Sequence, residues 1–453
     1  MSTAAKFSQV TGGRRRAAKA LLLALGLGAM SACSSSSTGG GGGGGGTIVF
    51  VFCPGDAPIW VAFQDGKSGS WTLLTPSNDS ISFKLTSSAG GLAAVTASGG
   101  GFDLGVIYAT KDQFTALSAY NTRVLGCESK TVHGTAANLA NGEYGSVGLG
   151  TSQAQILQNG VQFSLFNVPN DTVDMVATSN GTADLRIHKY IVRRQLDVAD
   201  GGSLDLLDFT SAEAFAKDTG AYTVTGLNGD NATVAGFFYG ASGTETANGY
   251  LGGGVTDATY EYDAIPDAKV NSGEFQLLRG FTNSRSAGTY IRNVGPITLA
   301  FGPALSTPTV TAPTTSPYVM PNVTVASQTE YKDELDAFFT GSANDAFMVT
   351  TADYLGSTPT TWNVTFPDLS AAPNFQTNWG LDATDFDWVV TGSGGTLLFQ
   401  NGAAPNNGDS FASASANGQN SSASGRRLGQ LWGHSADRQG TPRPRLLVKT
   451  PKR

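Results

Sequence analysis

Histidine is scarce in this sequence, and the motifs that many enzymes carry are absent. The 453 residues include three histidines, His133, His188 and His434. None of them lies in a serine-hydrolase, zinc-protease or nucleotide-binding signature. A nucleophile–histidine pair or a zinc centre therefore has no support in the sequence, and no catalytic residue, metal ligand or cofactor is predicted.

No apolar run is long enough to cross a membrane as a helix. The longest run, residues 20–30, has about half of the roughly twenty residues that a spanning helix needs. It follows a basic segment that contains Arg14, Arg15, Arg16 and Lys19. This order of basic and then apolar residues is typical of a secretory signal peptide.

The apolar run ends in Met30-Ser31-Ala32-Cys33, which resembles the lipobox of bacterial lipoproteins. In that family, small residues precede a cysteine whose thiol takes a diacylglyceryl group and which becomes the new N-terminus. The resemblance implies that residues 1–32 are a signal peptide, that Cys33 is lipidated, and that membrane lipid is a partner. The alternative is ordinary signal cleavage nearby, which would leave the Cys33 thiol free.

Large side chains are missing from residues 34–46, which contain only Ser, Thr and Gly. A segment of this composition buries nothing and behaves as a flexible coil. Residues 33–46 are therefore predicted to tether a folded body to a membrane of the cell envelope. Ser34 stands where lipoproteins retained at the inner membrane of enteric bacteria carry Asp, which favours the outer membrane.

Besides Cys33, the chain has two cysteines, Cys53 and Cys127. In an oxidising compartment they are predicted to form a disulfide. This bond would close a loop of about 75 residues and add on the order of 4 kcal/mol of stability. The alternative is two separate buried thiols. Neither cysteine has a histidine pair nearby, so a zinc site is not predicted.

Positive charge is scarce in the body and concentrated at the C-terminus. Residues 33–425 hold 34 acidic and 15 basic side chains, whereas residues 426–453 hold one acidic and eight basic side chains. An acidic body disfavours binding to the phosphates of nucleic acid. Glycine is abundant, and short β-branched and aromatic runs recur between turn residues, which predicts a mainly β protein.

The predicted architecture is two or more β-sandwich-like domains behind the lipid anchor and tether, with few short helices. Helices are predicted at residues 111–119, 210–217 and 332–340. The predicted units are a first β domain (47–127), a small β-sandwich (128–200), a β-rich region (201–310), a C-terminal β region (311–401) and a tail (402–453). The tail is predicted to be disordered, first polar and then basic.

Two family resemblances fall within this body. In residues 128–200, the order Phe163-Ser164-Leu165, then Val168-Pro169 and a further strand, resembles the prealbumin-like regulatory module of carboxypeptidases. It implies a β-sandwich with a structural role and without catalytic residues. Residues 60–66, 167–169 and 190–194 resemble an uncharacterised family of β-rich bacterial lipoproteins, which implies no activity.

Aromatic and acidic residues are the candidates for a binding site. Trp60 and Trp71 lie on the two strands of a predicted hairpin and could stack on sugar rings, although core packing is the commoner role of Trp. Asp382, Asp385 and Asp387 could hold calcium. The alternative for these three is the solvated outer face of a strand.

Two functions are compatible with the sequence. The first is a non-catalytic binding or structural role at the cell envelope, with an envelope glycan or protein as the partner. The alternative is a glycan-acting hydrolase that uses paired acidic residues, whose separation in space cannot be read from sequence spacing.

Overall fold

The computed structural model describes residues 46–52, 57–98, 100–124, 129–150, 152–169, 172–240, 245–396 and 405–420. Over these residues the protein is mainly β, with several packed sheets and two α-helices, which confirms the predicted fold class. Cys33, Cys53 and Cys127 lie outside the described residues, so lipidation and the disulfide stay predictions. Within the described ranges, no helix has both the length and the apolar character of a membrane span.

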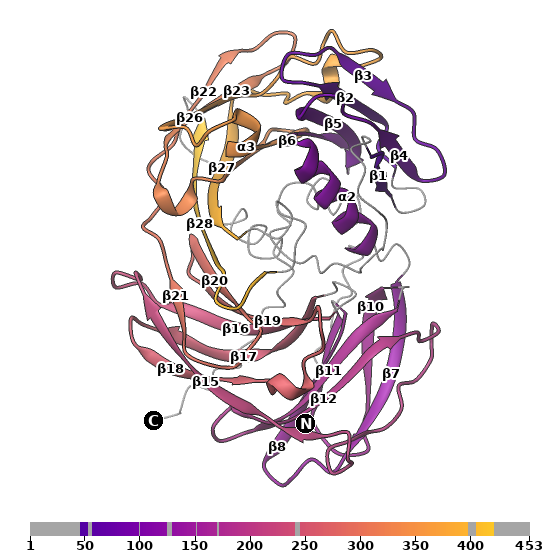
Figure 1. The fold of residues 1–453 in the computed structure, drawn as a ribbon. Helices are drawn as coiled ribbons and strands as arrows, with labels where there is room; N and C mark the ends of the chain where they lie inside the picture. Colours follow the sequence, from indigo (N-terminus) through magenta and orange to yellow (C-terminus); the bar gives the residue numbers. More distant parts are fainter. Residues whose placement is uncertain are drawn as a thin grey trace, which may run out of the picture.

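One curved sheet of twelve strands passes through both lobes of the molecule (Figure 1). Neighbouring strands are antiparallel except for β25 and β6, which are parallel. In sheet order the strands are β17 (Glu245–Val255), β16 (Ala232–Tyr239), β19 (Phe275–Phe281), β20 (Arg285–Ile291), β28 (Ser410–Asn420), β27 (Phe386–Gly395), β24 (Glu334–Thr340), β25 (Asp345–Thr351), β6 (Gly101–Thr110), β5 (Ala89–Ser98), β2 (Trp60–Asp65) and β3 (Trp71–Leu74).

In the upper lobe, both faces of this sheet are covered. The outer face packs around Trp362 and Val323 on a sheet of β22 (Thr309–Thr314), β23 (Met320–Ala326) and β26 (Thr361–Thr365). The inner face packs around Phe114 on α2 (Lys111–Val124), β1 (Ile48–Val51) and β4 (Ser80–Phe83). A short helix, α3 (Ala352–Leu355), follows β25. The apolar alternation of the central strands thus buries residues on both sides of the sheet.

In the lower lobe, the outer face of the same sheet packs around Leu278 and Val234. The covering sheet consists of β15 (Asp218–Thr225), β18 (Thr259–Ala264) and β21 (Ile297–Ala300).

Elsewhere in the described chain, short 3₁₀ turns lie at η1 (Asp267–Lys269), η2 (Thr329–Tyr331) and η3 (Thr377–Trp379).

Residues 129–216 form a separate β-sandwich beside the lower lobe. Phe163 and Leu165 of the predicted motif are buried between its sheets. The sandwich extends past residue 200, where the predicted unit ends. One sheet contains, in order, β10 (Gln162–Pro169), β7 (Ser129–Ala137) and β13 (Leu207–Asp208). The other contains, in order, β14 (Phe215–Ala216), β12 (Ile187–Leu196), β11 (Val173–Gly181), β8 (Glu143–Leu149) and β9 (Ser152–Ile156).

The structure joins two regions that the sequence predicts as separate units, residues 47–127 and residues 311–401. Strand β6 pairs with β25, from Asp103 opposite Asp345 to Tyr108 opposite Thr350. The division into a first β domain and a C-terminal β region is therefore wrong for this sheet. The pairing partners lie far apart in sequence, so no local pattern reveals them.

The predicted tail also needs correction, because Ser410–Asn420 form β28 between β20 and β27. Its Ala and Ser residues resemble a polar, low-complexity segment. The side chain that fills the space beside Gly418 belongs to the neighbouring strand β27. A Cβ atom added at Gly418 would lie 2.4 Å from the Trp388 ring. Small residues fit here because larger side chains of β27 already fill the space.

Of the three predicted helices, only the first is confirmed, and it is longer than predicted, as α2. Residues 210–217 contain the short strand β14. Residues 332–340 contain β24, in which Leu335, Ala337 and Phe339 alternate into the outer core. Pairing with β25 and β27 on both sides overrides the local helix signal of this segment.

Candidate functional site

Trp60 belongs to the core and does not form a sugar platform. Its side chain lies in the outer core of the upper lobe, with the whole residue 3% exposed. The indole Nε1 donates a hydrogen bond to the Pro373 carbonyl at 3.0 Å. The ring packs edge-on against Phe375, with 5.1 Å between centroids. Both its polar atom and its faces are thus occupied within the protein.

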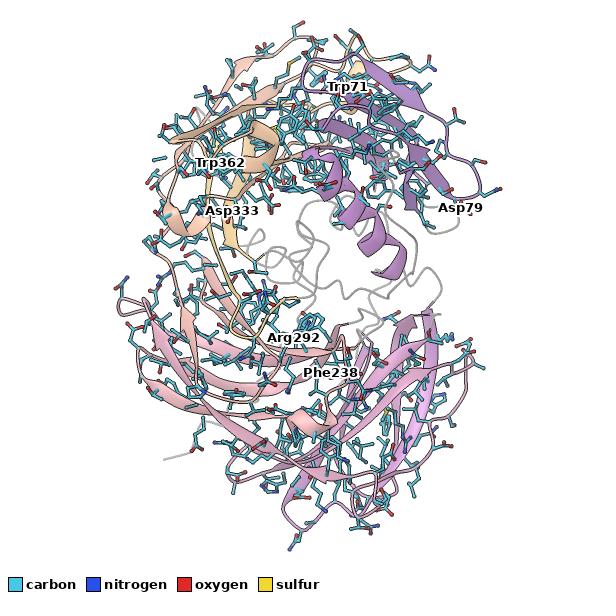
Figure 2. The ribbon with its side chains drawn as sticks, in the orientation of Figure 1. Trp71, Asp79, Phe238, Arg292, Asp333 and Trp362 are labelled. Carbon is cyan, nitrogen blue, oxygen red and sulfur yellow. The ribbon has the colours of Figure 1, made fainter. Side chains whose placement is uncertain are left out.

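Trp71, in contrast, is half-buried at the start of β3, the last strand of the twelve-stranded sheet (Figure 2). Its ring covers Gly91, where an added Cβ atom would lie 3.0 Å from Trp71 and 3.1 Å from Tyr108. The Trp71 and Tyr108 centroids are 6.5 Å apart. Tyr108 is in turn 5.1 Å from Tyr354. The rings of Trp71, Tyr108 and Tyr354 thus form a row, and the first two pack over Gly91, where no side chain blocks them.

Polar groups surround this aromatic row. The exposed Lys67 places its Nζ 5.5 Å from the Tyr354 centroid and donates to the Leu355 carbonyl at 3.0 Å. Burial raises the pKa of Tyr108, so its hydroxyl is neutral at physiological pH. Gln64 lies opposite Trp71 in the sheet, and its covered Oε1 accepts no hydrogen bond from the described residues. We call Lys67, Trp71 and Tyr108 the aromatic surface; Tyr354, which is 8% exposed, is buried and supports it.

Two of the three aspartates that were candidates for calcium, Asp382 and Asp387, have other partners. Asp382 accepts hydrogen bonds from the backbone N–H groups of Ser342 (3.1 Å) and Ala343 (3.0 Å) and from the Ser342 hydroxyl. Burial alone would raise the pKa of Asp382, but these bonds outweigh it and lower the pKa. Asp387 accepts from Gln419 Nε2 at 2.7 Å. In the described ranges, no group of three or more acidic, His or Cys side chains could hold a metal.

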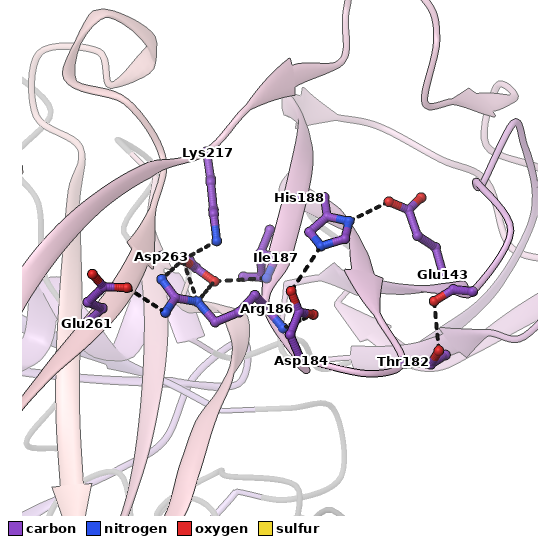
Figure 3. A network of polar contacts seen from close by, with 10 residues as sticks. Glu143, Thr182, Asp184, Arg186, Ile187, His188, Lys217, Glu261 and Asp263 are labelled. Atoms are coloured by element: carbon purple, nitrogen blue, oxygen red, sulfur yellow. Dashed lines mark hydrogen bonds and ion pairs between the residues drawn. The ribbon is translucent and has the colours of Figure 1, made fainter.

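A second acidic segment, residues 260–263, supplies the centre of a polar network at the junction of the sandwich and the β15–β18 sheet (Figure 3). The Asp263 side chain is 1% exposed. It accepts from Arg186 Nε at 2.9 Å, Lys217 Nζ at 2.7 Å and the Ile187 N–H at 2.8 Å. Burial alone would raise the pKa of Asp263, but Arg186 and Lys217 lower it. The network holds two layers together.

His188 lies beside this network, between two carboxylates. Its Nδ1 is 2.6 Å from Glu143 Oε1, and its Nε2 is 3.4 Å from Asp184 Oδ2. The hydrogen bond with Glu143 is the main cause that raises the pKa of His188. Both carboxylates have lowered pKa values, so they are charged whenever the imidazolium forms.

We expect His188 to stabilise the fold more in acid than in base. Its pKa is higher in the folded than in the unfolded protein, where it is about 6.5. The stabilisation is therefore complete below that value and is lost as the pH rises through the folded pKa. His188→Gln should lower the unfolding free energy by up to about 1 kcal/mol at pH 5, since the site is partly exposed, and by less at pH 8.5.

Denaturant unfolding at the two pH values measures this difference. His133→Gln is the matched control, because His133 Nδ1 contacts the Ser164 hydroxyl, at 2.9 Å, and not a carboxylate. A loss at His188 that is the same at both pH values would contradict the prediction.

The His133–Ser164 pair is not a catalytic triad, because the described contacts of His133 include no carboxylate to orient it.

Two acidic residues that the sequence analysis missed lie together on β24. Glu334 is 4% exposed and Asp336 is 9% exposed. Burial raises the pKa of Asp336 well above its usual range, and the nearby Glu334 raises it further. The glycosidase alternative requires such a pair at an accessible cleft, but a polysaccharide cannot contact side chains this deeply covered. The alternation of Glu334 and Asp336 with Leu335 and Ala337 was the available signal for a strand.

Neither a scan against protein-family models nor a search of the curated proteins finds a match to this chain.

Proposed function

We propose that this protein is a lipid-anchored, non-catalytic protein of the cell envelope that binds a glycan through the aromatic surface. The anchoring part of the proposal is supported by the lipobox resemblance at Cys33 and by the Ser/Thr/Gly tether. The body begins at β1 directly after this tether. We further propose the outer membrane as the location and keep an envelope protein as a second possible kind of partner.

The observation that carries the binding proposal is the partly buried Trp71 ring, which packs against the outer core and is held in place by Gly91 and Tyr108. The part of such an indole that remains in water is a suitable surface for the C–H face of a sugar ring. Because the ring is already seated, binding costs little side-chain entropy. Neighbouring Lys67 adds a charged donor for hydroxyl or carboxylate groups of the ligand.

The position of Trp71 at the sheet edge also supports access by a polymer. In the described sheet, β3 pairs only with β2, and its other side has no strand neighbour. A long glycan could therefore run past the edge without entering a closed pocket. For the sandwich of residues 129–216 we propose the structural role that its resemblance to the carboxypeptidase regulatory module implies.

A glycan array probed with residues 47–453, without signal peptide or lipid, tests this proposal. We expect binding to one class of envelope glycan, reduced at least tenfold by Trp71→Ala, because truncation of a central aromatic contact costs about 2 kcal/mol or more. Phe166→Ala is the matched control, since Phe166 is an aromatic residue 63% exposed on the sandwich. Equal losses in the two variants, or no binding across the array, would count against the aromatic surface.

A further inference from the structure

The buried pair Glu334 and Asp336 occupies the inner face of the twelve-stranded sheet. Alternate residues of β24 point to opposite faces, and Leu335, Ala337 and Phe339 lie in the outer core. The two acids therefore share the inner face, on which α2 packs in the upper lobe. Strand β24 lies between β25 and β27, close to the point where the sheet passes into the lower lobe through β28 and β20.

Asp336 lacks the partner that a buried carboxylate needs. The residue is nine-tenths buried, and its Oδ1 accepts no hydrogen bond within the described part of the chain. The ion pairs among the described residues do not include Asp336. Burying an unpaired carboxylate beside a second acid is costly unless a cation or a proton compensates it.

The neighbouring strand β27 places hydroxyl oxygens beside the pair, whereas on β25 Val349 stands opposite Asp336. Thr391 of β27 stands opposite Asp336, and Ser393 stands opposite Glu334. Directly opposed residues have Cβ atoms about 5 Å apart. The Thr391 hydroxyl is 2.8 Å from the hydroxyl of Ser415 on β28. The immediate side-chain donors are thus carboxylates and hydroxyls.

From this arrangement we infer that Glu334 and Asp336 bind a hard divalent cation, with Ca²⁺ as the best match. Two carboxylates balance its charge, and oxygen donors of variable geometry suit Ca²⁺. Mg²⁺ fits less well because it retains several waters in a strict octahedron, for which a covered site leaves little room. The cation would fasten β24 to β27 and stabilise the middle of the sheet. This site is independent of the aromatic surface.

Thermal unfolding of the full chain in EDTA and in Ca²⁺ tests the inference. We expect Ca²⁺ in the millimolar range to raise the Tm by several degrees and calorimetric titration to give one ion per chain. Asp336→Asn and Glu334→Gln keep the side-chain volume but remove one charge each, and both should abolish the shift. Asp387→Asn is the control: Asp387 lies on the same face but is paired with Gln419, so its shift should persist.

Three results would overturn the inference. The first is a wild-type Tm that Ca²⁺ at 10 mM does not change. The second is a Ca²⁺ shift that persists in both Asp336→Asn and Glu334→Gln. The third is Asp336→Asn with a higher Tm in EDTA while the wild type ignores Ca²⁺, which would show that the two acids share a proton instead. Glycan binding by the Asp336→Asn variant is a separate readout and should be unchanged.

Discussion

Replacement of Cys33 by alanine should release the protein from the membrane fraction. The thiol of Cys33 is the only atom that could take the diacylglyceryl group at the predicted lipobox, and no helix of the described residues can span a bilayer. Each buried methylene of an acyl chain contributes about 0.8 kcal/mol, and stable anchoring requires more than one chain. Loss of the modified cysteine thus removes the anchor completely.

Fractionation of cells into membrane and aqueous parts measures this effect, with detection of the chain by immunoblot. Cys53→Ala is the matched control, because it removes a thiol that is not at the lipobox and should leave the protein in the membrane fraction. If the Cys33→Ala protein sediments with membranes as the wild type does, the anchoring proposal fails.

Arg186→Ala should lower the unfolding free energy by about 3 kcal/mol. Arg186 donates two hydrogen bonds through Nε to the Asp263 carboxylate, whose side chain is 1% exposed, and a third through Nη2. Without Arg186, Lys217 and the Ile187 N–H are the partners among the described residues that remain to compensate a buried charge. Removal of one partner of a buried ion pair typically costs 3–5 kcal/mol, and the partial exposure of Arg186 favours the lower end.

Arg193→Ala provides the comparison for this loss. Arg193 lies on the adjacent strand β12 and makes a similar two-point contact with Glu213, but the Glu213 side chain is 37% exposed. An ion pair of this exposure is worth about 1 kcal/mol or less. Arg193 also donates to the carbonyls of Asp205 and Leu206, but these residues are exposed and their carbonyls can bond to water in the variant. Urea unfolding of both variants should therefore separate them clearly. Losses of the same size would mean that burial of Asp263 does not set the strength of the junction.

The sequence predicts the parts of this fold that depend on local patterns. In residues 128–200, turn residues separate short β-branched and aromatic runs, and the structure has β-strands there. Residues 111–119 lie within α2, where Phe114 and Leu117 reach the inner core from one face of the helix. Local periodicity is sufficient in these places because the tertiary environment agrees with it.

The long-range pairing of the sheet could not be predicted. Strand β24 has residues that also fit a helix, and only its place between β25 and β27 decides the outcome. Strand β28 is built from small residues, and Trp388 supplies its packing. In both cases a neighbour distant in sequence determines the structure, so single-segment patterns mislead.

The candidate site was partly within reach of sequence reasoning. Both tryptophans stood out as possible ligand contacts, but only the covering sheet shows that Trp60 is buried while Trp71 is not. The acids near residue 385 drew attention because they are adjacent in sequence. Glu334 and Asp336 are more deeply buried, and this burial depends on strands that no local pattern brings together.

The central claim is that the anchored body binds an envelope glycan and leaves it intact. The most direct test is to saturate residues 47–453 with a glycan that the array identifies and then determine the mass of the recovered glycan. The account predicts saturable binding that depends on Trp71 and a glycan of unchanged mass. Shorter products formed by the wild type would contradict it and favour a hydrolase.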